Sequence, residues 1–379
     1  MQLYVFAHPP PPVHGQSVMV KLLLDRLPAE PGFTVRPLAV RLSRDSADIG
    51  RLRPGKLFAL LVACARACRA RARHGPGYLY YVPAPGKRGA LYRDFIALAL
   101  CRPWFRGLIL HWHAVGLGAW LDTHASGLER WLARRLLGGA ALALVLAPQV
   151  ADDARRLSPR RLAVVPNGVP DPSGAPAPLP AGPVCRVLYL GLCSREKGVF
   201  DLVEACALLA ARAPGRFHVT LAGGAASPAE AEALRAAVAR LPDGSAAWIG
   251  FADAARKQAL LAGCDVFCFP TRYPHEGQPL VLIEALAHDR AIVTTRWRAI
   301  PGMLPAEHVQ FVPAGDPEAL AAALETAART PAPVGALRRH YLAHFTPERH
   351  IAVLAAALRS LEAAPPAYPD SCSRPSNQP

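Results

Sequence analysis

The sequence predicts an α/β protein of two successive domains, each a parallel sheet covered by helices. Short apolar segments alternate with longer helical stretches along residues 1–169 and again along residues 184–346. Such alternation is typical of βα units, whose strands are parallel. Residues 170–183 separate the two series and are dense in Pro, Gly and Ala without periodicity, which indicates a linker. Two such domains are expected to face each other across a cleft. Ligands would bind there, at the carboxyl ends of the parallel strands.

The length and the boundaries of each apolar run decide between strand and helix. Short runs rich in Val, Leu, Ile and Tyr that end at turn residues are expected to form strands. They lie at residues 2–7, 78–82, 108–113, 142–147, 163–169, 186–191, 218–222, 266–270 and 291–295. Longer stretches with helix start and stop signals are expected to form helices. They lie at residues 17–27, 199–213, 228–241, 279–287 and 317–328.

The chain is expected to end in one more helix and a tail. The helix over residues 347–362 is expected to pack back on the first domain. The Pro- and Ser-rich residues 363–379 are expected to be disordered, as chain ends without apolar anchors are.

The excess positive charge lies in the first domain. Residues 1–170 hold 24 Lys and Arg against nine Asp and Glu, whereas residues 171–379 hold 19 of each. The formal net charge of +15 therefore favours a polyanionic partner for one domain, either acidic lipid headgroups or nucleic acid. No nucleic-acid-binding motif is recognisable, so we do not expect nucleic acid as a partner.

Residues 56–74 carry the densest run of this charge. The run begins with apolar side chains and ends with alternating Arg, as in a helix with an apolar flank and a basic end. Two interpretations stay open. The segment either contacts an anionic membrane peripherally or is an ordinary core helix with a solvated end.

The cysteines and the N-terminus favour a cytoplasmic protein, with peripheral attachment to the inner face of the cell membrane left open. The nine cysteines show no zinc-ligand spacing and are expected to be buried free thiols in a reducing compartment. The chain enters a strand-like run at Gln2 without the basic region of a signal peptide. No uninterrupted apolar stretch reaches the roughly 18 residues of a spanning helix.

The strongest candidate site is the segment from His275 to Glu284, between a strand and a helix. Pro279 is expected at the first helical position, where its missing N–H costs nothing. The N–H groups of Leu280 and Val281 would then point outward at the positive end of the helix dipole and could bind phosphate. Glu284 lies one turn further on the same face as Leu280, where a carboxylate could accept hydrogen bonds from ribose hydroxyls.

Glu276 lies in the loop before this helix and is followed by Gly277 and Gln278. Its carboxylate would lie beyond the phosphates, near a sugar, where it could stabilise positive charge at the anomeric carbon. The alternative is a surface Glu followed by an unrelated Glu on the helix face.

A second candidate site lies at residues 191–198, after a strand and before a helix. Gly198 permits a tight turn there, and Lys197 could place its charge on a diphosphate. Taken alone, the segment is explained equally well as a simple helix cap.

The third candidate is the Pro-rich N-terminal loop that leads into Gly15, Gln16 and Ser17. Gly15 would let the backbone come close to a ligand at the start of the next helix. In the alternative interpretation, Ser17 only caps that helix.

The fourth candidate is the pair His111 and His113 at the end of an apolar strand, where alternation turns both side chains to the same side. Contact with a sugar is one interpretation and metal ligation is another. No third ligand lies nearby, and the chain contains no Asp-x-Asp to hold a divalent ion against a diphosphate. We therefore expect neither a metal nor another cofactor.

Together these motifs resemble those of the retaining glycosyltransferases of family four. The segment from Glu276 to Glu284 resembles their E-x7-E signature, and further landmarks resemble theirs in order at residues 14–17, 164–169 and 189–198. The likeness spans residues 1–362 and implies the GT-B fold, two Rossmann-like domains facing across a cleft. It implies a metal-independent hexosyltransferase of the bacterial surface-polysaccharide type. The first domain would bind a saccharide or lipid-linked acceptor, and the second a nucleotide-sugar, commonly a UDP-sugar.

The resemblance also implies roles for single residues. Glu284 would bind the ribose, Glu276 the donor sugar and Lys197 the diphosphate. His113, preferred over His111 because it ends the strand, would contact the sugar from the acceptor side. The donor site would be completed by Gly15, Gln16, Arg195, Gly277, Gln278, Leu280 and Val281.

Two positions depart from the family pattern. The Arg that often follows the glycine of the phosphate strand is Leu192 here, so either Arg195 replaces it or Lys197 acts alone. The common Glu-Gly-Phe-Gly is Glu-Gly-Gln-Pro, so Pro279 cannot donate an N–H and Gln278 is the candidate to compensate.

Two other functions stay open. A nucleotide-sugar epimerase of the same fold would need no acceptor and would leave the basic first domain without a role. A non-catalytic partner subunit that binds nucleotide-sugar would explain Leu192, although both acids are present.

Overall fold

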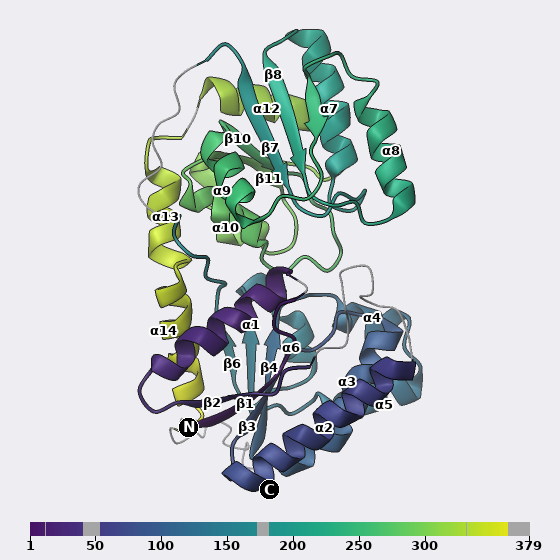
Figure 1. The fold of residues 1–379 in the computed structure, drawn as a ribbon, viewed down its shortest axis with the longest axis vertical. Coiled ribbons are helices and arrows are strands. Elements are labelled where there is room, and N and C mark those ends of the chain that lie inside the picture. Colours follow the sequence, from purple (N-terminus) through teal and green to yellow (C-terminus); the bar gives the residue numbers. More distant parts are fainter. Residues whose placement is uncertain (12, 41–53, 173–181, 331, 363–379) are drawn as a thin grey trace, which may run out of the picture.

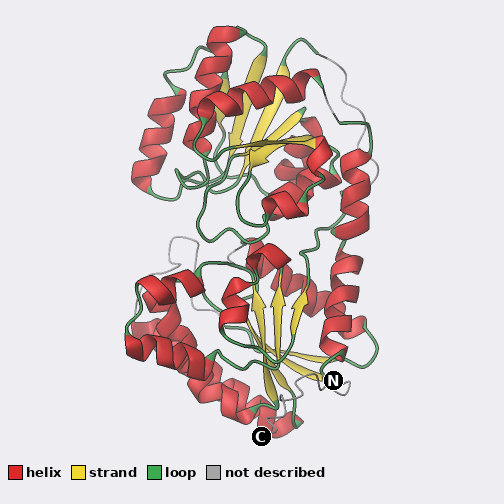
Figure 2. Cartoon of the chain, turned by 180° about the vertical axis from the view of Figure 1, so that it is seen from behind, coloured by secondary structure: helices red, strands yellow, loops and turns green. Residues whose placement is uncertain are grey.

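The computed structural model describes residues 1–11, 13–40, 54–172, 182–330 and 332–362. These residues form two α/β domains stacked end to end (Figure 1), and each domain contains one six-stranded sheet. Every strand pairing in both sheets is parallel. The strands of the N-terminal sheet point toward the other domain (Figure 2), so their carboxyl ends face it.

The N-terminal sheet has the strand order β2-β1-β3-β4-β5-β6. Its strands are β1 (Gln2–Phe6), β2 (Thr34–Pro37), β3 (Tyr78–Tyr81), β4 (Gly107–Trp112), β5 (Leu142–Val145) and β6 (Leu162–Val164). The C-terminal sheet has the order β12-β11-β10-β7-β8-β9. Its strands are β7 (Cys185–Leu190), β8 (Phe217–Ala222), β9 (Ala246–Trp248), β10 (Val266–Phe269), β11 (Ala291–Thr295) and β12 (Val309–Val312).

Helices cover both faces of the N-terminal sheet. Alternate residues along each strand point to opposite faces, so Leu79 joins one apolar core and Tyr80 the other. The first core is closed by α2 (Pro54–His74), α3 (Arg88–Cys101), α4 (Leu117–Thr123), α5 (Gly127–Leu136) and α6 (Asp152–Arg156). The second is closed by α1 (Gly15–Arg26) and α14 (Pro347–Arg359). The last helix of the chain thus packs on the first domain.

The C-terminal sheet is enclosed in the same way. On one face α7 contacts both α8 and α12, and on the other α10 contacts α13. These helices are α7 (Val199–Arg212), α8 (Pro228–Val238), α9 (Ala254–Gly263), α10 (Leu280–Ala287), α11 (Ile300–Met303), α12 (Pro317–Arg329) and α13 (Ala336–His344). Short 3-10 helices are η1 (Leu27–Ala29), η3 (Arg102–Trp104), η4 (Pro148–Val150) and η5 (Ala306–His308).

The expected strands agree with the observed ones to within one or two residues, apart from the strand expected at 163–169, which ends at Val164. The sequence missed β2, β9 and β12, and all three lie at a sheet edge. An edge strand faces solvent on one side, so its apolar signal is weak. Residues 173–181 of the expected linker and the expected tail at 363–379 lie outside the described residues. In the described ranges, no helix is both long and apolar enough to cross a membrane.

Replacing Leu354 by Ala is expected to destabilise the protein strongly. Leu354 of α14 is fully buried against the N-terminal sheet, so its truncation leaves a cavity and should lower the free energy of unfolding by about 2–5 kcal/mol. Urea unfolding measures this change. The matched control is Leu342→Ala in α13, where the side chain is 48% exposed and the cost should stay below about 1 kcal/mol. Equal losses in both variants would show that α14 does not hold the first domain.

Candidate functional site

The loop between β10 and α10 lies where the two domains meet. Residues 270–279 leave the carboxyl end of β10, the edge at which parallel sheets bind ligands. A Cβ on Gly277 would lie 2.5 Å from the carbonyl oxygen of His113, just beyond β4, so only glycine permits this approach. His275 Nδ1 donates to the Val115 carbonyl (2.8 Å), and the Val115 N–H donates to the His275 carbonyl (3.4 Å). The loop is therefore held against the N-terminal domain.

Gln278 makes a second contact between the domains. The backbone N–H of Asn167, in the segment after β6, donates to Gln278 Oε1 (2.7 Å), and Asn167 Nδ2 donates to the Gln278 carbonyl (3.0 Å). Both side chains are buried. The sequence suggested that Gln278 compensates for the N–H missing at Pro279. Its amide oxygen is already bonded to Asn167, so only its amide nitrogen could serve a ligand.

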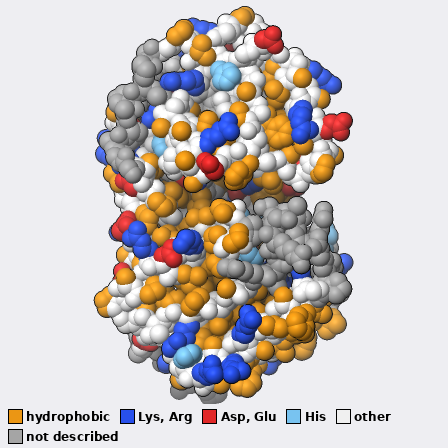
Figure 3. Space-filling model, in the orientation of Figure 1, with side chains coloured by type: hydrophobic (Ala, Val, Ile, Leu, Met, Phe, Trp, Pro, Cys, Tyr) orange, Lys and Arg blue, Asp and Glu red, His pale blue; other side chains and the backbone are white. Residues whose placement is uncertain are grey.

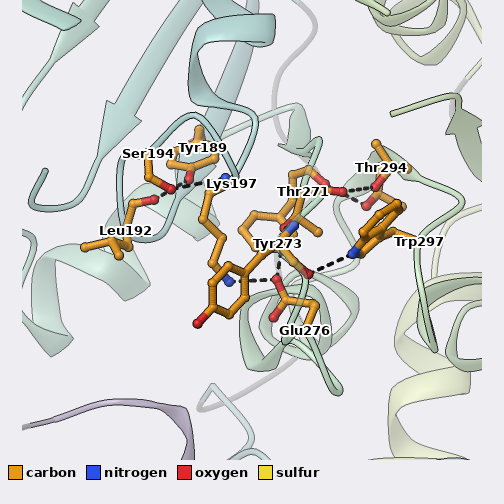
Figure 4. A network of polar contacts seen from close by, with 11 residues as sticks. Tyr189, Leu192, Ser194, Lys197, Thr271, Tyr273, Glu276, Thr294 and Trp297 are labelled. Atoms are coloured by element: carbon orange, nitrogen blue, oxygen red, sulfur yellow. Dashed lines mark hydrogen bonds and ion pairs between the residues drawn. The ribbon is translucent and has the colours of Figure 1, made fainter. Parts of the chain in front are cut away.

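Glu276 is the centre of a polar network (Figure 4). Its Oε2 accepts hydrogen bonds from Lys197 Nζ (2.6 Å) and from Thr271 Oγ1 (3.0 Å). Thr271 is itself fixed, because its carbonyl accepts the Thr295 hydroxyl and its Oγ1 accepts the Tyr273 N–H (3.2 Å). The Glu276 side chain is buried, and a buried carboxylate is stable only with such partners.

Lys197 reaches Glu276 from the loop between β7 and α7. The helix begins after Gly198, whose φ of +75° is in the left-handed region. A Cβ at Gly198 would lie 2.0 Å from the Pro270 carbonyl oxygen, so glycine lets this loop pack against the end of β10. The ammonium lies 4.5 Å from the centre of the Tyr273 ring. The sequence assigned Lys197 to a diphosphate, and the structure adds Glu276 as its partner.

Leu192 and Arg195 belong to the same loop but do not contact Glu276. Leu192 is half exposed, and Figure 4 shows its side chain turned away from Glu276. The exposed guanidinium of Arg195 lies 4.4 Å from the centre of the Phe200 ring. Lys197, and not Arg195, is therefore the cation of this loop that pairs with Glu276.

Glu284 is paired with a lysine that the sequence did not single out. Lys257 of α9 forms an ion pair with Glu284 Oε1. Oε2 of Glu284 is buried and has no hydrogen-bond partner among the described residues. Burial raises the pKa of the Glu284 carboxyl, and the Lys257 ammonium opposes that rise. The carboxylate thus keeps one unused acceptor oxygen.

The helix that carries Glu284 begins one residue later than expected. Pro279 is its N-cap, with an extended ψ of 119°, and α10 begins at Leu280. The expectation of Pro279 at the first helical position was wrong, because the chain is still extended there. The N–H groups of Leu280 and Val281 lie in the first turn, which has no intrahelical acceptors.

The first turn of α1 faces the first turn of α10 across the domains. A Cβ on Gly15 would lie 3.8 Å from the Leu280 side chain. Gly15 is exposed and Gln16 is half-buried. The alternative role of Ser17 as N-cap was wrong, because the cap is His14. The His14 imidazole accepts the Ser17 N–H (3.3 Å), and Ser17 Oγ accepts the His14 N–H (3.0 Å).

Histidines gather at the end of β4. The rings of His111 and His113 lie 4.1 Å apart, on the same side as alternation predicted. His111 Nδ1 is bonded to the Tyr80 hydroxyl. Burial, reinforced by the nearby His350 and His14, lowers the pKa of His113 to about 3, so this ring is neutral at pH 7. His113 Nε2 is buried and has no hydrogen-bond partner among the described residues, so it could bond to a ligand.

Lys257 and Asn167 are residues of this site to which sequence reasoning gave no role. The scarcity of lysine in the sequence could have pointed to Lys257. The chain has five lysines among its 43 basic residues, and the two in the second domain are Lys197 and Lys257. These are the two that pair with Glu276 and Glu284. Asn167 gave no such signal, because its partner lies 111 residues away.

No three His, Cys, Asp or Glu side chains of the described residues are grouped so that they could together hold a metal ion. The eight cysteines of the described ranges are free thiols.

The second domain matches a known family of proteins. Residues 185–329, which include Lys197, Lys257 and both paired carboxylates, match the family of Glycosyl transferases group 1. The protein is a glycosyltransferase. No curated protein matches the glycosyltransferase significantly.

Solved structures share the fold of the whole glycosyltransferase. Sucrose-phosphate synthase from Thermosynechococcus elongatus superposes with a TM-score of 0.74 at 20% identity, covering 95% of this chain and 98% of that one. HepE of Anabaena, in complex with UDP and glucose, gives 0.68 at 18%, covering 95% and 99%. The lipopolysaccharide outer core galactosyltransferase WaaB gives 0.63 at 13%, covering 95% and 99%. The predicted GT-B architecture is confirmed.

Stability is expected to fall in mild acid through the titration of His113. Its pKa is about 3 in the folded protein and about 6.5 when unfolded. Between these values only the unfolded chain binds the proton. The free energy of unfolding should therefore fall as the pH drops below about 6.5, by up to about 1.4 kcal/mol per pH unit for this group.

The measurement is urea unfolding at several pH values between neutrality and mild acid. His113→Asn should flatten the slope, while the control His74→Asn, at the exposed end of α2, should not. A slope unchanged by His113→Asn would mean that other groups cause the acid sensitivity.

Lys257→Met is expected to destabilise the protein through Glu284. Removing the lysine leaves a buried carboxylate without its counter-charge. Because Lys257 is 31% exposed, the cost should be about 1–3 kcal/mol, less than for a fully buried pair. The double variant Lys257→Met, Glu284→Gln should recover part of this loss in thermal unfolding. If the exposed neighbour Arg256→Met costs as much as Lys257→Met, the ion pair does not stabilise the site.

Proposed function

We propose that this glycosyltransferase moves a sugar from a UDP-sugar to a saccharide or lipid-linked acceptor in the assembly of a surface polysaccharide or glycolipid. The anomeric configuration is retained and no metal ion takes part. One observation carries the proposal. Glu276 and Glu284 flank the first turn of α10, and each is paired with one of the two lysines of the second domain.

The nucleotide of the donor fits the end of the site that contains Glu284. The unused Oε2 of Glu284 can accept hydrogen bonds from ribose hydroxyls. The N–H groups of Leu280 and Val281 can donate to the diphosphate at the positive end of the α10 dipole. Gly15 brings the first turn of α1 to the same place from the opposite domain. Backbone amides from both domains would then share the phosphate charge.

The sugar of the donor fits the end that contains Glu276 and His113. The carboxylate of Glu276 would hold the sugar, and His113 Nε2 would donate or accept one hydrogen bond from the acceptor side. The bond between the anomeric carbon and the diphosphate oxygen breaks. The acceptor oxygen forms its bond on the same face, and its proton passes to the departing diphosphate. Lys197 and the helix amides stabilise the charge of that leaving group, a role that a metal fills in other transferases.

Relatives of the same fold support the choice of substrates. Anabaena HepE was solved with UDP and with UDP-glucose, which supports a UDP-sugar as the donor. WaaB is a galactosyltransferase of the lipopolysaccharide outer core, which supports a surface glycan acceptor. The basic N-terminal domain suits an enzyme on the inner, cytoplasmic face of the cell membrane, where anionic lipids lie.

Glu276→Gln is expected to abolish most sugar transfer while leaving UDP bound. The substitution keeps the shape of the side chain but removes the charge next to the sugar, so kcat should fall by about 10²-fold or more. Transfer is measured as UDP release from a panel of UDP-sugars with and without acceptor. Consumption of the donor that needs no acceptor and no water would indicate an epimerase or another reaction.

Two controls accompany this variant. Glu232→Gln, an exposed carboxylate on α8, should keep full activity. UDP at about 100 times its Kd should still stabilise Glu276→Gln by about 2.7 kcal/mol in thermal unfolding, because Glu284 is intact. Unchanged turnover of Glu276→Gln would overturn the proposed role of this carboxylate. Loss of turnover on adding a chelator would overturn the metal-independent mechanism.

A further inference from the structure

Large apolar side chains are exposed on the outer side of three helices of the N-terminal domain. The most exposed are Phe58 of α2 (71%), Leu128 of α5 (66%) and Trp131 of α5 (59%). Leu57 and Leu61 of α2 are also exposed, and so is Tyr92 of the neighbouring helix α3. We call the outer side of α2, α3 and α5 the α2–α3–α5 face. Exposed apolar groups gathered in this way indicate a contact surface.

The three helices run side by side in the same direction. At their later turns, Arg71 Nε of α2 donates to the Trp104 carbonyl just after α3 (2.8 Å). Arg102, at the end of α3, donates to the Leu136 carbonyl at the end of α5 (2.7 Å). At their beginnings, the Tyr92 hydroxyl of α3 donates to Glu129 in the first turn of α5 (2.9 Å). The six apolar side chains therefore lie in the first halves of parallel helices, whereas Leu100 near the end of α3 and Trp104 just after it are exposed beside the later turns.

The beginnings of these helices lie at the cleft end of the domain. In a βα unit the helix starts where its strand ends, and α3 follows the carboxyl end of β3. That end of the sheet faces the second domain, as Figure 2 shows. The apolar part of the α2–α3–α5 face thus lies on the side of the domain from which an acceptor would enter.

The later turns of the same helices are strongly basic. The three helices contain ten Lys and Arg and two acids, Asp94 and Glu129. Both acids are buried and already bonded, Asp94 to Arg93 and Glu129 to Arg88. Figure 3 shows hydrophobic side chains over the first part of α2 and Lys or Arg side chains toward its end. The exposed arginines of the later turns are Arg66, Arg69, Arg73, Arg134 and Arg135.

We propose that the α2–α3–α5 face binds the surface of an anionic phospholipid bilayer. Leucine and aromatic side chains enter the boundary between headgroups and acyl chains, and the arginines bind the lipid phosphates. Charge complementarity favours an anionic bilayer as the partner, because the α2–α3–α5 face has exposed cations and no exposed acid. A nucleic acid would leave the apolar part without a role, and a second copy of the chain would bring like charges together. The inference rests on the proposed function, since it places the cleft beside a membrane that holds a lipid-linked acceptor.

Vesicle flotation with the full chain tests the proposal. The wild type should float with vesicles containing about one third anionic lipid and stay behind with neutral ones. Binding should weaken at about 0.5 M salt, since lipid phosphates are then screened. Arg66→Glu with Arg69→Glu should weaken binding by roughly fivefold or more for each arginine. Phe58→Ser with Trp131→Ser should weaken binding as well, and this loss should be unaffected by salt.

Matched controls come from the second domain. Phe251→Ser, at a phenylalanine 77% exposed, and Arg240→Glu with Arg256→Glu, at two exposed arginines, should bind vesicles like the wild type. The proposal would be overturned if the control variants weakened vesicle binding as much as the variants of the α2–α3–α5 face do. It would also be overturned if the wild type did not bind anionic vesicles. A shift from dimer to monomer in Phe58→Ser with Trp131→Ser would assign the face to a second copy instead. Binding of RNA that is unaffected by the same double variant would assign the arginines to nucleic acid.

The test separates this proposal from the proposed function. The vesicles contain no acceptor and no donor, so flotation does not depend on sugar transfer. The variants of the face should still be stabilised by UDP and should still act on a soluble saccharide acceptor. Failure of Glu276→Gln to lose activity would overturn the mechanism and leave the flotation result standing. Failure of flotation would remove the membrane contact and leave the transfer reaction standing.

Discussion

The ion pair between Lys197 and Glu276 joins the two loops from which the rest of the site is built. Its atoms lie 2.6 Å apart, and both side chains are largely buried. A charge in such surroundings is stable only beside its partner, so each side chain fixes the other. Gly198 lets the first loop pack against Pro270, and Gly277 lets the second approach His113. The ion pair thereby fixes the loops after β7 and β10 to each other, and His275, Gly277 and Gln278 hold the second loop against the opposite domain.

The pairing of acids with lysines also sets the electrostatics of the site before any ligand arrives. Two lysines balance two glutamates, and His113 is neutral at pH 7 because burial lowers its pKa to about 3. These groups together offer no net positive charge to a diphosphate. In the proposed function, the first turns of α1 and α10, which approach each other at Gly15 and Leu280, therefore contribute backbone amides to the binding of phosphate. The unused oxygen of Glu284 and Nε2 of His113 remain as polar atoms that a bound donor would satisfy.

The two domains differ in their charge. The C-terminal domain is neutral by sequence and carries both lysine–carboxylate pairs, whereas the N-terminal domain carries the whole excess of positive charge. The loop from β10 bridges them through His275, Gly277 and Gln278. The helix α14 returns to cover the first sheet. The surface that we propose for anionic lipid and the site that we propose for the nucleotide-sugar thus lie in different domains and can be changed independently.

The amino-acid sequence by itself determined the two α/β domains, the strands of both sheet interiors and the segment that holds Glu276 and Glu284. These features are local, because apolar periodicity and turn residues lie within a few positions of the element that they specify. The edge strands β2, β9 and β12 were not predicted, since half-exposed strands have a weak pattern of apolar residues. Only the tertiary structure decided that Lys257 pairs with Glu284, that Asn167 holds Gln278 and that His14 caps α1. The first two of these contacts join residues 27 and 111 positions apart, and such pairing is decided by how the sheets and domains pack, not by any local pattern.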